Sequence, residues 1–115
     1  MQIINQSGEL KTVDLYHLTM SPATQKMKDI KGQRLEVSCW CIYEDVQKST
    51  GALQEILAVK TPENEVFATN SPTFIEDFTN MWNLFKSNGE TVNAITVISG
   101  KSKSDREFIT CTYAG

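Results

Sequence analysis

Side chains alternate in character with a period of two from Arg34 to Glu44. Because successive side chains of a strand point to opposite faces, this pattern predicts one long strand with one face on a core. On this parity Trp40 lies on the face away from the core, and the opposite parity would exchange the two faces. The residues that share the expected core face are Leu35, Val37, Cys39, Cys41 and Tyr43.

Four other segments have the composition of strands and are bounded by turn residues: 53–60, 65–69, 94–99 and 107–113. A helix is expected between the second and third of them. Ser71-Pro72 provides a cap followed by proline at the first helical position, and Thr73 and Glu76 have capping-box spacing. Apolar residues then recur at three- and four-residue steps until Asn88-Gly89 ends the helix.

The resulting order of three strands, one helix and two strands is that of a five-stranded OB-type barrel, whose ligand face lies over its second and third strands. A plain antiparallel sheet with a helix across one face satisfies the same order and stays an alternative. With 115 residues the chain is long enough for one core and too short for two. We therefore predict one mainly β domain over 1–115.

Residues 1–33 are weakly patterned and are expected to form an arm that packs on this domain. Residues 13–20 suggest a short apolar element. Ser21-Pro22 then looks like a cap with proline at the first helical position, which predicts a turn or two of helix at about 22–29.

The residues that could carry chemistry predict no enzyme, cofactor or metal site. His17 is the only histidine, and no segment has the pattern of a nucleophile elbow or a cysteine-protease motif. Cys39, Cys41 and Cys111 lack the paired spacing of a zinc site. No glycine-rich phosphate loop is present.

Charge and hydropathy place the chain away from membranes. Eleven basic against fourteen acidic residues give a net charge of −3, and no apolar run approaches the roughly 18 residues of a membrane span. Residues 1–6 lack the basic start and apolar stretch of a secretory signal. We therefore expect a cytoplasmic protein whose three cysteines are reduced.

Two short segments are basic although the whole chain is acidic. Residues 26–34 carry four cations against one acid, and residues 101–106 carry three against one. In single-strand binding sites cations follow the phosphates and aromatic rings stack on the bases. Core packing for the rings and a solvated turn for the loop cations are the structural alternatives. The candidate DNA-binding residues are Trp40, Tyr43, Phe67, Arg34, Lys60, Lys101, Lys103, Arg106 and Phe108.

Three blocks, LTMSPATQKMKDIKGQRLEV, VFATNSPTFIEDF and ISGKSKSDREFITC, resemble small single-stranded DNA-binding proteins of phages and mobile elements of Gram-positive bacteria. The resemblance covers about residues 10–113. It implies an OB-type fold, sequence-tolerant binding of single strands, and a part in replication or recombination of the element in the bacterial host cytoplasm. It also implies that Lys101, Lys103 and Arg106 form the basic loop of the last hairpin.

Cellular single-strand binders typically end in a disordered acidic tail that recruits partners. This sequence ends at Tyr113-Ala114-Gly115, so recruitment through such a tail is not expected. Replication or recombination proteins and a second copy of the chain, as a homodimer, are the other partners left open.

A second hypothesis comes from a different class of function. The same barrel face could bind a host protein, as in an interaction or inhibitor domain. Net acidity favours this alternative, whereas the two basic segments and the resemblance favour single-stranded DNA.

Overall fold

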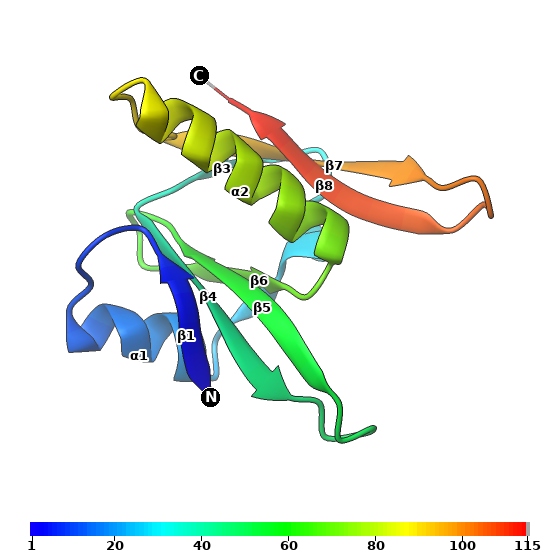
Figure 1. Ribbon diagram of the computed structural model, residues 1–115, viewed down its shortest axis with the longest axis horizontal. Coiled ribbons are helices and arrows are strands. Elements are labelled where there is room, and N and C mark those ends of the chain that lie inside the picture. Colours follow the sequence, from blue (N-terminus) through cyan, green and yellow to red (C-terminus); the bar gives the residue numbers. More distant parts are fainter. Residues whose placement is uncertain (115) are drawn as a thin grey trace.

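The computed structural model describes residues 1–114 and shows a mainly β fold with two α-helices in that part of the chain (Figure 1). This confirms the predicted class of secondary structure. The strands are β1 (Gln2–Gln6), β2 (Gln25–Lys26), β3 (Arg34–Glu36), β4 (Cys39–Val46), β5 (Leu53–Lys60), β6 (Val66–Thr69), β7 (Ala94–Lys101) and β8 (Glu107–Tyr113). The helices are α1 (Thr12–Met20) and α2 (Pro72–Ser87), and η1 (Met27–Ile30) is a 3₁₀ turn.

The strands form two sheets that do not close into a barrel within residues 1–114. The larger sheet has the order β1-β4-β5-β6-β2 and the smaller one the order β3-β7-β8. All pairs are antiparallel except β2 and β6, which are parallel. Figure 1 shows α2 between the two sheets, where it packs against β8 and β5. The strands therefore form two sheets, and the five-stranded OB-type barrel stays a prediction.

The segment predicted as one strand from Arg34 is divided between the two sheets. β3 pairs with β7, whereas β4 pairs with β5. At the division the Val37 N–H donates to the Asn93 carbonyl oxygen at 2.8 Å. The next N–H, that of Ser38, donates to the Lys60 carbonyl oxygen, also at 2.8 Å. Alternation in the sequence cannot reveal this change of partner, because both halves keep an extended backbone.

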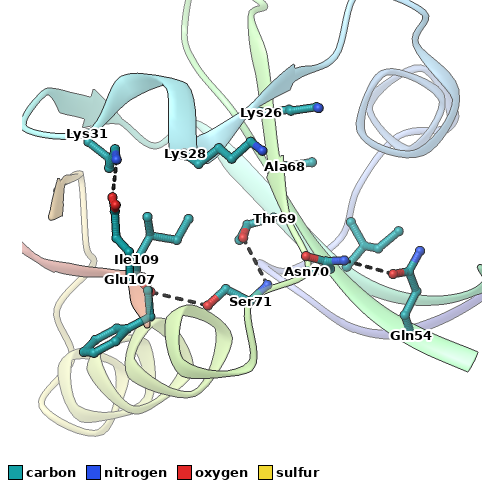
Figure 2. Close-up of a pocket in the computed structure, with 12 residues that line it drawn as sticks. Lys26, Lys28, Lys31, Gln54, Ala68, Thr69, Asn70, Ser71, Glu107 and Ile109 are labelled. Atoms are coloured by element: carbon teal, nitrogen blue, oxygen red, sulfur yellow. Dashed lines mark hydrogen bonds and ion pairs between the residues drawn. The ribbon is translucent and has the colours of Figure 1, made fainter. Parts of the chain in front are cut away.

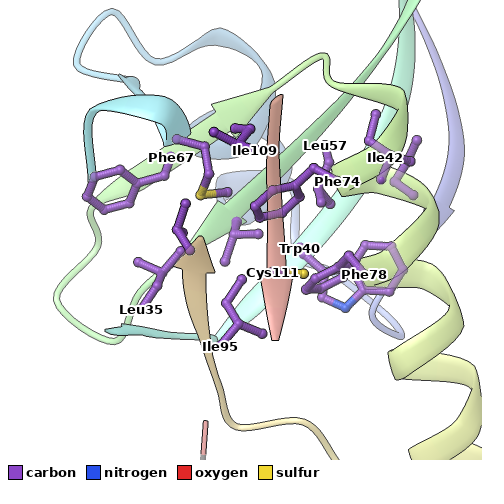
Figure 3. Packing of buried hydrophobic residues seen from close by; sticks show 14 of the residues in the cluster. Leu35, Trp40, Ile42, Leu57, Phe67, Phe74, Phe78, Ile95, Ile109 and Cys111 are labelled. Carbon is purple, nitrogen blue, oxygen red and sulfur yellow. The ribbon is translucent and has the colours of Figure 1, made fainter. Parts of the chain in front are cut away.

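Most of β4 is buried on both faces, so the predicted division into a core face and an outer face is wrong. Trp40 and Ile42 lie in the main core with Phe78 of α2 (Figure 3). Cys41 lies in a second cluster with Leu18 of α1. Helix α1, which was not predicted, covers the Cys41 face, and α2 covers the Trp40 face that was expected to point away from the core.

The N-terminal arm contains more structure than predicted. The helix expected at about 22–29 does not form: α1 ends at Met20, with Ser21 as its C-cap, and β2 and η1 follow at residues 25–30. Ser21 has an extended backbone (φ −65°, ψ 127°), as is common for a residue that precedes proline. Pro22 therefore follows a helix here and does not begin one. β1, which was not predicted either, pairs with β4.

Helix α2 begins and ends where the sequence predicts. The Ser71 Oγ accepts a hydrogen bond from the Phe74 N–H at 3.3 Å, which caps the first turn. After the helix ends, Gly89 adopts a left-handed conformation with φ 72°. Phe74, Ile75 and Phe78 are buried, so α2 joins the two sheets through one apolar stripe.

Candidate functional site

A groove of about 730 Å³ opens between η1, the start of α2 and the start of β8, with β5 and β6 also lining it (Figure 2). It lies where the two sheets separate, because β6 belongs to the larger sheet and β8 to the smaller one. Segments that are far apart in the chain thus meet around one opening, which we call the groove.

Three lysines form one wall of the groove. Lys26, Lys28 and Lys31 come from β2, from η1 and from the residue after η1. Met27 lies between the first two and is fully buried, so it anchors this segment while both neighbouring lysines stay exposed. Neither Lys26 nor Lys28 forms an ion pair within residues 1–114. Their charges are therefore available to an anion in the groove.

Lys31 is the paired lysine of this wall. Its Nζ donates to Oε1 of Glu107 at the start of β8, and the pair spans the groove from η1 to β8 (Figure 2). This contact holds the pKa of the Glu107 carboxyl below its ordinary value. Both side chains are about half exposed, at 42% and 52%. The pair is thus accessible to a ligand from solvent.

Neutral polar groups line the other end of the groove. The Asn70 Nδ2 donates to the Gln54 Oε1 at 3.0 Å, which joins the residue after β6 to β5 (Figure 2). Thr69 Oγ1 accepts from the Ser71 N–H at 3.1 Å, and Ser71 Oγ donates to the Ile109 carbonyl oxygen at 3.3 Å. These groups offer hydrogen bonds without adding charge.

Phe108 supplies an aromatic ring to the groove. It is partly buried and lies opposite Gly100 across the β7–β8 pair. A Cβ atom at Gly100 would lie 2.8 Å from the ring carbon Cζ, closer than van der Waals contact permits. Glycine at position 100 therefore allows the Phe108 ring to lie against β7. The half-buried side chains of Ile56 and Ala68 extend this apolar surface.

Three of the predicted stacking residues are buried, which corrects their assignment to a DNA-binding surface. Trp40, Tyr43 and Phe67 are 0%, 7% and 6% exposed. Trp40 contacts Phe78 and Trp82 edge-on, so its ring belongs to the main core. A ring that has no free face cannot stack on a base. The core alternative considered for the rings is the correct one at these positions.

Lys60 also has a structural partner. Its side chain is 11% exposed, and its Nζ donates to the Asp14 Oδ1 at 2.8 Å, which ties β5 to α1. The prediction that Lys60 binds DNA is therefore corrected. Arg34 is exposed but lies outside the groove, where its Nη1 pairs with the Glu36 Oε1 at 3.1 Å.

The remaining predicted residues lie at or near one end of the groove. Phe108 lines it, and Lys101, Lys103 and Arg106 lie in or beside the exposed turn between β7 and β8. Lys101 pairs with Asp105 at 3.7 Å. That these four residues contact DNA stays a prediction.

Sequence reasoning recognised the basic segment 26–34 but selected Arg34 from it, whereas Lys26, Lys28 and Lys31 line the groove. A single apolar residue between two cations, Lys26-Met27-Lys28, was the signal that could have selected the first two. Gln54, Asn70 and Glu107 carry no local signal, because only the tertiary fold brings them to the same opening.

The cysteines and the histidine do not line the groove. No group of three or more His, Cys, Asp or Glu side chains is placed to hold a metal within residues 1–114. Burial raises the pKa of Cys41 to about 11 and that of Cys111 to about 12, so both thiols are protonated and weakly nucleophilic near neutral pH. His17 lies on α1 beside the Tyr16 ring and does not line the groove.

Comparison with known proteins gives no match for this chain to a family model, a curated protein or a solved structure. No helix in residues 1–114 is long and apolar enough to cross a membrane.

Proposed function

We propose that the protein binds single-stranded DNA in the groove with little sequence preference. The observation that carries this proposal is the wall of three lysines facing an opening that also holds the Phe108 ring. Lysines neutralise successive phosphates, and an exposed ring stacks on a base of any type. A single strand offers phosphates and base faces together, whereas a duplex keeps its base faces stacked inside. This combination therefore favours a single strand.

An OB-type arrangement is part of the proposal. On this reading β3 and β4 are two halves of a bent first strand, β5 to β8 are the other four, and α2 follows the third. The groove then lies over the second and third strands, β5 and β6, as the ligand site of that fold does. The continuous segment from β3 to β4, which pairs first with β7 and then with β5, supports this interpretation.

The biological setting in the proposal rests on the resemblance of the three sequence blocks. It is replication or recombination of the DNA of a phage or mobile element in the cytoplasm of a bacterial host. The proposed partners are single-stranded DNA, replication or recombination proteins, and a second copy of the chain.

Fluorescence anisotropy with a labelled oligo-dT and a matched duplex, at several salt concentrations, tests the proposal. We expect tighter binding to the single strand and a log–log salt slope of about −3, since four or five cations in reach each contribute about −0.7. The double variant Lys26→Ala/Lys28→Ala should bind more weakly, with a slope shallower by about 1.4. Lys86→Ala, at the far end of α2 from the groove, is the matched control.

Equal binding of duplex and single strand would refute the proposed preference for single strands. The same salt slope in Lys26→Ala/Lys28→Ala and in Lys86→Ala would refute the groove as the binding site. No binding of either nucleic acid would favour the second candidate, a domain that binds a host protein. One observation supports that candidate: Val46 and Leu53 pair across the β4–β5 hairpin while 53% and 69% exposed. Residues 36–90 around this hairpin carry nine acids against three lysines.

A further inference from the structure

Glu107 is the only acidic side chain among the residues that line the groove in the described part of the chain. It begins β8, and its Cα lies opposite that of Lys101 at the end of β7. Its carboxylate accepts a hydrogen bond from Lys31 on the other wall (Figure 2). In space, Glu107 therefore lies between Lys31 of the first basic segment, 26–34, and Lys101 of the second, 101–106.

Because the Lys31–Glu107 pair is exposed, another anion can replace Glu107 as the partner of Lys31. An ion pair between two half-exposed side chains contributes little to stability, because water and salt screen it. A phosphate oxygen accepts the same hydrogen bond from an ammonium group as a carboxylate oxygen does. A phosphate that enters the groove can thus take the place of Glu107 on Lys31 without unfolding either wall.

The negative charge of Glu107 also affects the electrostatic potential in the groove. The hydrogen bond from Lys31 and, more weakly, the charge of Lys101 lower the pKa of Glu107, because both cations favour its charged form. With its charge in place, the positive surface is interrupted at the junction of η1 and the β7–β8 hairpin.

We propose that Glu107 is a built-in counter-ion that occupies Lys31 in the free protein and that a phosphate of the bound strand displaces. This inference rests on the proposed function, since it assigns an autoinhibitory contact to the same groove. Displacing Glu107 leaves a carboxylate that takes up a cation from solution, so the contact with Lys31 yields little net release of counter-ions. Glu107 thereby lowers both the affinity and the salt dependence that the lysine wall would otherwise give.

Oligo-dT binding by Glu107→Gln tests this inference. The amide keeps the size of the side chain and removes its charge. We expect affinity at low salt to rise by up to about fivefold, the upper range for an exposed ion pair. The log–log salt slope should steepen by about 0.7, because Lys31 now releases a counter-ion on binding. Glu36→Gln is the matched control, since it frees Arg34 outside the groove from a similarly exposed pair.

The double variant Lys31→Ala/Glu107→Gln, compared with Lys31→Ala, shows whether the effect acts through Lys31. If the gain disappears when Lys31 is absent, the counter-ion role is supported. If the gain persists, Glu107 acts by general repulsion and the inference is overturned.

The failure of this inference is distinct from that of the proposed function. Wild-type binding that Glu107→Gln leaves unchanged overturns the counter-ion role alone. If Glu107→Gln binds the oligonucleotide and the wild type does not, the counter-ion role is supported, because Glu107 then blocks Lys31 completely. Absence of binding in both proteins overturns the proposed function and this inference together. Equal melting temperatures of wild type and variant show that a change in affinity is not a change in folding.

Discussion

Trp40 is the largest fully buried side chain among the described residues, and its ring lies edge-on to Phe78 and Trp82, with centroids 5.2 Å from each. Its Nε1 has no hydrogen-bond partner within residues 1–114. We expect Trp40→Ala to lower the free energy of unfolding by about 3–5 kcal/mol. Trp40→Phe should cost less, because an aromatic ring remains and no N–H is left unsatisfied. Urea denaturation followed by circular dichroism measures both.

Trp40→Phe also distinguishes a core role of Trp40 from a role in stacking on bases. Trp40→Phe should bind oligo-dT as the wild type does, since its ring has no exposed face. A variant of unchanged stability that binds the oligonucleotide much more weakly would contradict the core assignment.

The Asp14–Lys60 pair predicts how stability depends on pH. The hydrogen bond from Lys60 is the largest cause that lowers the pKa of Asp14 from its ordinary value of 3.8. A carboxyl with a depressed pKa stabilises the fold above its unfolded pKa, and this contribution is lost as the pH falls through the folded pKa. Asp14→Asn should therefore be less stable than the wild type at pH 7, with a difference that shrinks below pH 3.8.

Melting temperatures of both proteins from pH 7 to pH 2 measure this difference. Asp29→Asn is a suitable control, since Asp29 is exposed and forms no ion pair in the described part of the chain. A gap between wild type and Asp14→Asn that stays constant with pH would contradict the assigned role.

At the scale of the elements, the sequence predicts those parts that local interactions decide. Helix α2 is predicted with its boundaries because Ser71, Pro72 and Gly89 act within a few residues of its ends. The division of β3 from β4 is not predictable, since it depends on which distant strand accepts each N–H. The burial of Trp40 follows from the same limit, because alternation cannot show that α2 covers the Trp40 face of β4 while α1 covers the Cys41 face.

The candidate site divides in the same way. The basic segment that contains Lys26 and Lys28 is visible in the sequence as a local excess of charge. The contribution of Gln54 and Asn70 depends on β5 and β6 lying beside η1 and β8, which only the fold determines. Lys60 was misassigned because its partner, Asp14, is 46 residues away in the chain.

The turn between β7 and β8 is an element whose charges are separable from its packing. Ser102 N–H donates to the Arg106 carbonyl oxygen at 2.9 Å, so the backbone closes the turn without its basic side chains. Replacing Lys101, Lys103 and Arg106 together by alanine should change the unfolding free energy by only about 0.5 kcal/mol. Oligo-dT binding should weaken, with a salt slope shallower by about 1 to 2, because Lys101 is already paired with Asp105.

Denaturation and anisotropy titrations of this triple variant measure the two effects separately. An unchanged salt slope together with unchanged stability would remove the turn from the binding surface. Binding would then be left to the lysine wall of the groove.

The two sheets of the protein are joined by shared structure. The chain passes from β3 in the smaller sheet to β4 in the larger one through Val37 and Ser38. The N–H of Val37 donates to the carbonyl oxygen of Asn93, just before β7, and the N–H of Ser38 donates to that of Lys60 in β5. Trp40 of the larger sheet, Phe78 of α2 and Cys111 of the smaller sheet belong to one core. Neither sheet can lose its packing without exposing the apolar face of the other.

This shared core predicts that both sheets unfold in one transition, as small single domains usually do. The cysteines report on the two sheets separately, because Cys39 and Cys41 lie on β4 and Cys111 lies on β8. All three are free and buried, and burial raises the pKa of each thiol, so a thiol reagent that attacks the thiolate should react slowly with the native protein. Three variants that each keep one cysteine, with the other two replaced by alanine, should become reactive at the same fraction of their own unfolding transition. Labelling of the Cys111 variant well before its circular dichroism signal changes would show instead that the smaller sheet opens by itself.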